Sequence, residues 1–236
     1  MANKKDLNFE TKVIHAGQKS DPTTGAVMTP IVLASTFEQS SPGVHKGYDY
    51  SRSINPTREA FENCIASLEN GVKGYGFSSG VAAISACIEL LSPGDHVIAM
   101  DDLYGGSVRL FNEIKTISQG IEVSYVDMTN VDNIKADLKE NTKMIFVETP
   151  TNPLLKIADL SKIARLAKAN KILTVCDNTF ASPFNQQPIN HGFDIVIHSA
   201  TKYLGGHSDL IAGAMVIGKK DKKLINRMSN IHNSLG

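Results

Sequence analysis

The sequence predicts an α/β protein with a mainly parallel seven-stranded sheet and helices on both faces. From Lys73 onward, short apolar runs alternate with amphipathic segments, and Gly, Pro or Asp stands at the joints, which is typical of repeated strand–helix units. The runs are apolar almost throughout, as expected for strands covered on both faces. The predicted strands are 74–77, 96–100, 122–126, 144–147, 172–176, 194–198 and 211–217, and the predicted helices between them are 81–91, 107–117, 131–139 and 160–169.

Length and composition favour one domain with an appended arm. The 236 residues are 42% hydrophobic and 20% charged, and 24 basic residues balance 24 acidic ones, so no broad field attracts nucleic acid or an anionic membrane. No segment approaches the length needed to span a bilayer. The three cysteines lie far apart in apolar sequence, without zinc-like spacing, which favours buried reduced thiols. The N-terminal segment has charge but no apolar core for export, so we expect a cytoplasmic protein.

Residues 1–45 are predicted to form the N-terminal arm, and residues 46–236 the α/β domain. Glycine and proline interrupt the arm repeatedly, so one or two helical turns and an extended piece fit there. The apolar segment from Val27 to Phe37 has no partner within the arm. We expect it to contact a neighbouring subunit, and an arm folded back on its own domain is the alternative.

A helix is predicted from Asn55 onward. Asn55 can cap it, Pro56 suits its first position, and Gly71 ends it. Just before it, Tyr50 and Arg52 point to one side of an extended chain, where a hydroxyl and a guanidinium can bind an anion. The alternative for this pair is a surface arginine beside a packed tyrosine.

The unusual residues follow the predicted strands. Because the carboxyl ends of parallel strands meet at one edge of a sheet, ligands usually bind there. At the first of these loops, the backbone N–H groups of Gly80 and Val81 open a helix and can bind an anion, although simple helix capping is an alternative. Tyr104, in the sequence DDLYGG, can stack on a ring, and the two prolines of ETPTNP fix the direction of Asn152.

Asp177 and Lys202 complete the set. Asp177 directly follows a buried strand, where a carboxylate needs a cationic partner, although a turn aspartate is the alternative. Lys202 follows the strand 194–198 together with Ser199 and Thr201, and taken alone it would be a solvated charge. One ligand requires a lysine for an aldehyde, a carboxylate for a ring nitrogen and a helix N-terminus for a phosphate, and that ligand is pyridoxal phosphate.

Five segments, YSRSINPTR, DDLYGG, ETPTNP, DNTFASP and SATKYLGGHSD, closely resemble the Cys/Met-metabolism family of pyridoxal-phosphate enzymes. The resemblance covers nearly the whole chain. It implies the fold type I architecture and a homotetramer, a dimer of dimers with active sites shared across subunits. It also implies a small amino-acid substrate and the chemistry of transsulfuration.

The resemblance gives each matching residue a role. Lys202 would form the Schiff base and move protons as a general base, Asp177 would pair with the pyridinium nitrogen, and Tyr104 would stack on the ring and assist the reaction. The cofactor-binding set would be completed by Gly80, Val81, Ser199 and Thr201 at the phosphate, Asn152 beside the ring hydroxyl, Thr179 near the cofactor, and Tyr50 and Arg52 from the neighbouring subunit.

Within the family, the form YSRSINPTR favours the cystathionine γ-synthase and γ-lyase type, with cystathionine β-lyase as the alternative. Methionine γ-lyase is disfavoured, because it has a cysteine where this sequence has Gly106. The family continues beyond the length of this chain, so we expect a missing C-terminal domain that carries the arginine for the substrate carboxylate. A truncated, non-catalytic cofactor-binding or assembly module is the alternative of another class. A nicotinamide-binding protein is disfavoured, because no glycine fingerprint follows the first strand.

Overall fold

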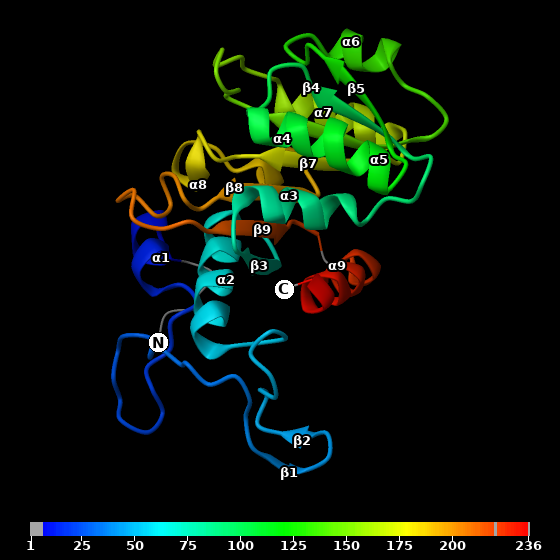
Figure 1. Cartoon of the computed structure of the whole chain (residues 1–236). Helices are drawn as coiled ribbons and strands as arrows, with labels where there is room; N and C mark the ends of the chain where they lie inside the picture. The colour runs from blue at the N-terminus through cyan, green and yellow to red at the C-terminus, as the bar shows by residue number, and fades with distance from the viewer. Residues whose placement is uncertain (1–6, 220, 236) are drawn as a thin grey trace.

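The computed structural model describes residues 7–219 and 221–235, and its centre is a seven-stranded sheet (Figure 1). The strand order is β3-β9-β8-β7-β6-β4-β5. The strands are β3 (Lys73–Phe77), β4 (His96–Met100), β5 (Glu122–Val126), β6 (Thr142–Glu148), β7 (Leu173–Asp177), β8 (Ile195–Ser199) and β9 (Gly213–Ile217). Each predicted strand is therefore confirmed, with bounds that differ by no more than two residues.

The sheet is mainly parallel, as predicted, with one reversed strand. Neighbours from β5 to β8 pair in parallel, whereas β9 pairs antiparallel with both β8 and β3. The reversal follows from the connection, because no helix lies between β8 and β9 and a chain that returns directly to a neighbouring strand must run antiparallel. As a result, β3 runs with the parallel set, and its carboxyl end lies at the same edge.

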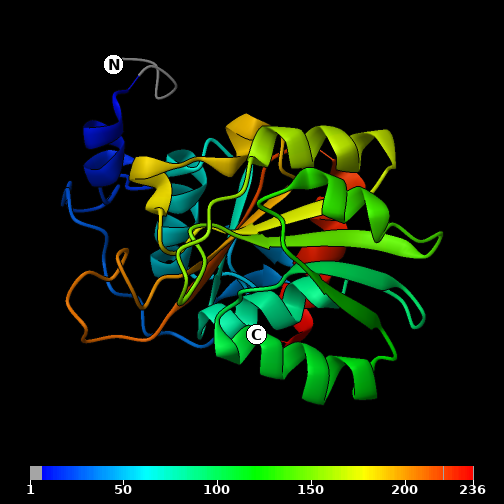
Figure 2. The same ribbon diagram turned by 90° about the horizontal axis from the view of Figure 1, so that it is seen from above.

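Helices cover both faces of the sheet, and Figure 2 shows α7 on one side and α3, α4 and α5 on the other. The helices beyond the arm are α2 (Pro56–Leu68), α3 (Gly80–Ile88), α4 (Gly105–Arg109), a π-helix (Leu110–Lys115), α5 (Thr116–Ser118), α6 (Val131–Ala136), α7 (Leu160–Ala169), α8 (Ser182–Asn185), a 3-10 helix (Pro188–His191) and α9 (Lys222–Leu235). The predicted helix 107–117 is thus a composite of three consecutive helical segments, α4, the π-helix and α5, and α9 was not predicted.

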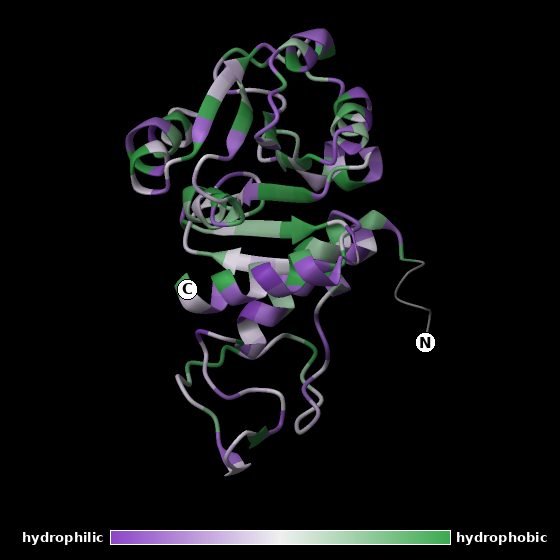
Figure 3. Cartoon of the chain, turned by 90° about the vertical axis from the view of Figure 1, so that its right-hand side faces the viewer, coloured by the Kyte–Doolittle hydropathy of each residue, from purple (hydrophilic) through white to green (hydrophobic). Residues whose placement is uncertain are grey.

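The core lies along the central strands. Every residue of β4 and β9 is buried. Several strands carry long apolar stretches, whereas the helices alternate apolar and polar residues (Figure 3). Cys87 and Cys176 are buried, as predicted, whereas Cys64 is only half-buried, and none of these three cysteines forms a disulfide in the structure. No helix among the described residues is long and apolar enough to cross a membrane.

The arm extends away from the sheet below α2 (Figure 1). It contains α1 (Phe9–His15), which packs on α2, and the short strands β1 (Gln39–Ser41) and β2 (Val44–His45). Its apolar segment is exposed, with Ile31 at 79% and Leu33 at 91%. It is held at Val32, whose N–H donates to Thr57 Oγ1. Residues 1–6 of the predicted arm, together with Lys220 and Gly236, lie outside the described residues.

Candidate active site

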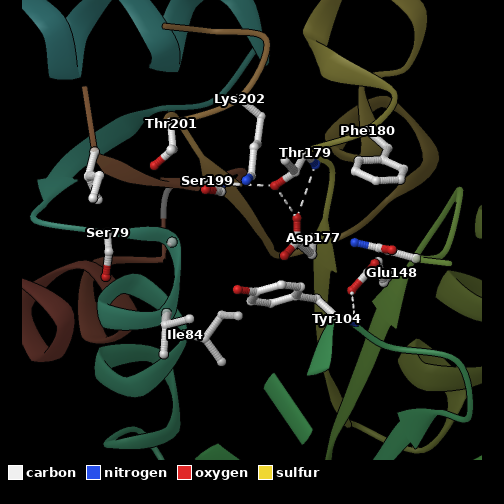
Figure 4. Close-up of a pocket in the computed structure, with 14 residues that line it drawn as sticks. Ser79, Ile84, Tyr104, Glu148, Asp177, Thr179, Phe180, Ser199, Thr201 and Lys202 are labelled. Atoms are coloured by element: carbon white, nitrogen blue, oxygen red, sulfur yellow. Dashed lines mark hydrogen bonds between the residues drawn. The ribbon is translucent and has the colours of Figure 1, made fainter. Parts of the chain in front are cut away.

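A cavity of about 270 Å³ opens at the carboxyl edge of the sheet. Residues at or after the ends of five strands, β3, β4, β6, β7 and β8, line it (Figure 4), because six of the seven strands end at this edge. The lining residues are Ser79, Gly80, Val81, Ile84, Tyr104, Glu148, Asn152, Asp177, Thr179, Phe180, Ser199, Thr201, Lys202 and Ile211. Nine of them were predicted as site residues, and the fold brings these nine to one cavity.

The start of α3 forms one wall of the cavity. Ser79 caps the helix, because its side-chain hydroxyl accepts the N–H of Ala82 at 3.0 Å. The N–H groups of Gly80 and Val81 belong to the first turn and have no partners within the helix. Gly80 lies so close to β8 that a Cβ atom there would stand 2.8 Å from Ser199 Cβ and 2.9 Å from Ser199 Cα. The helix start and the Ser199 backbone therefore form a narrow cradle suited to an anion.

Asp177 is held in one orientation at the end of β7. Its Oδ1 accepts the N–H of Thr179 at 3.0 Å and the hydroxyl of Thr179 at 2.5 Å. Thr179 Oγ1 in turn accepts the N–H of Ser199 at 2.8 Å, which joins β7 to β8. Burial raises the pKa of Asp177 above its usual value, and the hydrogen bonds from Thr179 oppose that shift. A buried carboxylate in this setting favours a cation beside it.

Lys202 stands on a loop that is fixed at both ends. Thr201 and Ala212 exchange two hydrogen bonds through the Thr201 hydroxyl, at 3.2 and 3.1 Å, and the N–H of Lys202 donates to Ser199 O at 3.1 Å. In Figure 4 the ammonium group of Lys202 lies beside Ser199, on the side of the cavity that faces Asp177. A primary amine and a carboxylate are thus presented to the same space.

Tyr104 and Asn152 also line the cavity. The Tyr104 ring lies between Ile84 and Asp177 (Figure 4). A Cβ atom at Gly106 would stand 2.4 Å from the ring, so the absence of a side chain at Gly106 allows this ring position. The N–H of Tyr104 donates to Glu148 Oε2 at 3.0 Å. An aromatic ring of this kind can cover a flat ligand.

Glu148 was not predicted as a site residue. It is the last residue of β6 and pairs directly with Asp177, the last residue of β7, so the two side chains lie on the same face of the sheet. The signal in the sequence was the shared position, since each acid ends an apolar run. The other unpredicted lining residues are Ser79, Ile84, Phe180 and Ile211.

Tyr50 and Arg52 lie outside this cavity. The Arg52 guanidinium stands 5.3 Å from the centre of the Tyr50 ring, and it donates a hydrogen bond to Asn233 O. Tyr50 is 41% exposed. The structure therefore does not bring this pair to the cavity of its own chain.

The arrangement fits pyridoxal phosphate, because an anion cradle, an aromatic cover, a buried acid and an amine surround one cavity. Fold and site together define a pyridoxal-phosphate-dependent enzyme of fold type I. Residues 10–236 match the family model described as "Cys/Met metabolism PLP-dependent enzyme". The chain belongs to this family, and the family depends on pyridoxal phosphate.

Curated relatives agree with this assignment. A cystathionine beta-lyase of Coxiella burnetii is 55% identical over 99% of this chain and 60% of its own length. A probable cystathionine gamma-synthase of Herpetosiphon aurantiacus is 45% identical over 98% of this chain and 72% of its own length. A solved cystathionine gamma-lyase of Lactobacillus plantarum, complexed with L-serine, matches with a TM-score of 0.93 and 45% identity over 97% of this chain and 59% of that one. The chain thus spans about 60% of the length of the first of these relatives.

Proposed function

We propose that this chain is the cofactor-binding part of a transsulfuration enzyme that acts on sulfur amino acids, of the cystathionine γ-synthase or γ-lyase type. The observation that carries the proposal is the convergence of Lys202, Asp177 and the start of α3 on one cavity. Cystathionine β-lyase is the second candidate, favoured by the name of the 55% identical relative. Methionine γ-lyase fits less well, since a side chain at position 106 would collide with the Tyr104 ring.

The cofactor supplies an electron sink for the charge that develops at the substrate Cα atom. The residues of this chain bind, orient and move protons. Asp177 holds a proton on the ring nitrogen, and Thr179 keeps its carboxylate in place. The Lys202 amine, placed on the same side, removes the Cα proton and passes it on.

The remaining roles concern binding. Tyr104 would cover the ring and Asn152 would lie beside the ring hydroxyl. The phosphate would be held by the other four cavity residues that were predicted for it: Gly80, Val81, Ser199 and Thr201. The Thr201 hydroxyl already exchanges hydrogen bonds with Ala212. A hydrogen bond between the Thr201 hydroxyl and the phosphate would therefore be additional to the two that this hydroxyl already makes.

A neighbouring subunit completes the site in this proposal. Tyr50 and Arg52 lie away from the cavity of their own chain and next to the exposed apolar arm, which supports their use in another copy. We place them at the partner's phosphate in a homotetramer built as a dimer of dimers. The buried free thiols Cys87 and Cys176 support a reducing, cytoplasmic environment.

The test combines trapping with product analysis. Borohydride reduction of the yellow protein is expected to fix the cofactor on the peptide that contains Lys202, and a label on another lysine would refute the assignment. Incubation with cystathionine is expected to yield 2-oxobutyrate if the γ-bond is cleaved. Pyruvate would support the β-lyase candidate, and bound cofactor without any product would support a non-catalytic module.

A further inference from the structure

Glu148 is a second acid in the cofactor cavity. Its side chain comes from β6, next to Asp177 on β7, and the two residues are paired in register. Glu148 is 5% exposed and Asp177 is 8% exposed. Two carboxylates in adjacent buried positions repel each other, so one of them keeps a proton unless a cation enters.

The surroundings decide which acid keeps it. Asp177 accepts two hydrogen bonds from Thr179, and these hydrogen bonds, followed by the charge of His198, favour the ionised form of Asp177. Glu148 accepts the N–H of Tyr104, and Asp102, in the loop after β4, adds to the negative charge around it. Burial, and next the charge of Asp177, raise the pKa of Glu148 to about 8, against the lowering effect of backbone N–H groups. Glu148 therefore holds the proton at neutral pH.

We propose that Glu148 is the proton reservoir of the cofactor site, meaning that it keeps a proton while no ligand lies beside Asp177 and releases it when a cofactor ring binds there and becomes, or already is, protonated at its nitrogen. The O–H bond of Glu148 breaks, and the proton goes to the ring nitrogen if the ring enters neutral, or to solvent if the ring enters already protonated. The site then contains two carboxylates against the cationic ring. This inference rests on the assignment of pyridoxal phosphate to the cavity.

Proton release also affects Tyr104. A carboxylate is a stronger acceptor than a neutral acid, so the hydrogen bond from the Tyr104 N–H to Glu148 Oε2 strengthens when the ring enters. The main chain of Tyr104 is then held more firmly while its ring covers the ligand. Glu148 is thus a positioning residue whose charge responds to the ligand.

The test counts protons during binding. The apoprotein is titrated calorimetrically at pH 7 with 4′-deoxypyridoxine 5′-phosphate, which lacks the aldehyde and cannot react with Lys202. Repeating the titration in buffers of different ionisation enthalpy gives the net number of protons exchanged. The wild type is expected to release about one more proton per site than Glu148→Gln, because the ionisation of the ligand itself cancels in this difference.

A matched control is Glu122→Gln, which alters an exposed glutamate at the far edge of the same sheet. It is expected to exchange the same number of protons as the wild type. Equal proton counts for the wild type and Glu148→Gln would overturn the inference while leaving the cofactor site intact. Failure of the analogue to bind the wild type would overturn the cofactor assignment and the inference with it.

A second measurement needs no variant. The infrared difference spectrum of the wild type, recorded with and without the analogue, is expected to show loss of a protonated carboxyl band on binding. A band that persists in the complex would overturn the inference. This measurement remains decisive if Glu148→Gln does not fold.

Discussion

Replacing Gly80 by alanine should open the anion cradle at the start of α3. The new Cβ atom would stand 2.8 Å from Ser199 Cβ, 2.9 Å from Ser199 Cα and 3.2 Å from Ser199 N. Ordinary carbon contacts are about 3.5–4.0 Å, so the helix start must move from β8 by roughly 1 Å. Because two of these atoms belong to the backbone, no side-chain rotation can relieve the contact.

A movement of this size breaks hydrogen bonds to a bound phosphate. An N–H group placed about 2.9 Å from a phosphate oxygen would move beyond hydrogen-bonding distance. A hydrogen bond to a charged group contributes about 1.5–3 kcal/mol, so the loss of one weakens cofactor binding about 10- to 150-fold. The dissociation constant is measured by spectroscopic titration of the apoprotein.

The control for this prediction is Gly105→Ala. Gly105 is the first residue of α4, as Gly80 is the first residue of α3, and a Cβ atom there meets nothing within 4 Å. Both variants gain the same helix propensity, so the difference between them isolates the contact with Ser199. Wild-type affinity in Gly80→Ala would refute the geometry proposed for the cradle.

Three further changes test other parts of the site. Asp177→Asn should retain cofactor but lower turnover about 10²- to 10³-fold, since a neutral partner no longer favours the protonated ring, and unchanged turnover would exclude the proposed role. Gly106→Ala should displace the Tyr104 ring and weaken cofactor binding by about two- to tenfold relative to Gly105→Ala, because aromatic stacking contributes about 0.5–1.5 kcal/mol. Glu148→Gln should raise the melting temperature of the apoprotein increasingly from pH 5 to pH 8, since the folded wild type keeps a proton that the unfolded chain releases near the ordinary value of 4.5. A difference in melting temperature that does not change with pH would contradict this last expectation.

The positions of the site loops were predictable because apolar runs mark buried strands and the chain order marks their ends. Asp177 and Lys202 each follow such a run, and parallel pairing brings both to one edge. The direction of β9 was not predictable in this way, because an apolar run indicates a buried strand but not whether that strand runs parallel or antiparallel to its neighbours. Its reversal depends on the lack of a helix between β8 and β9.

Other features depend on contacts that no local pattern encodes. Glu148 ends an apolar run as Asp177 does, but the runs do not show which strands are neighbours, so its place beside Asp177 depends on the register between β6 and β7. Helix α9 escaped prediction because its described buried side chains are only Met228 and His232, which is too few to show a helical period. The roles of Tyr50 and Arg52 depend on a second chain and stay predictions.

The reversed strand β9 has a consequence for how this site can vary. Because β8 ends and β9 begins at the same edge, residues 200–212 leave the sheet and return to it side by side, and Thr201 and Ala212 fasten the base of the excursion. Lys202 stands beside that base at one end of the excursion and Ile211 at the other, whereas residues 206–208 lie exposed midway between them. Insertions or substitutions in the middle of this loop would leave the Lys202 amine in place. The loop is therefore a position where substrate preference could change while the reactive groups keep their arrangement.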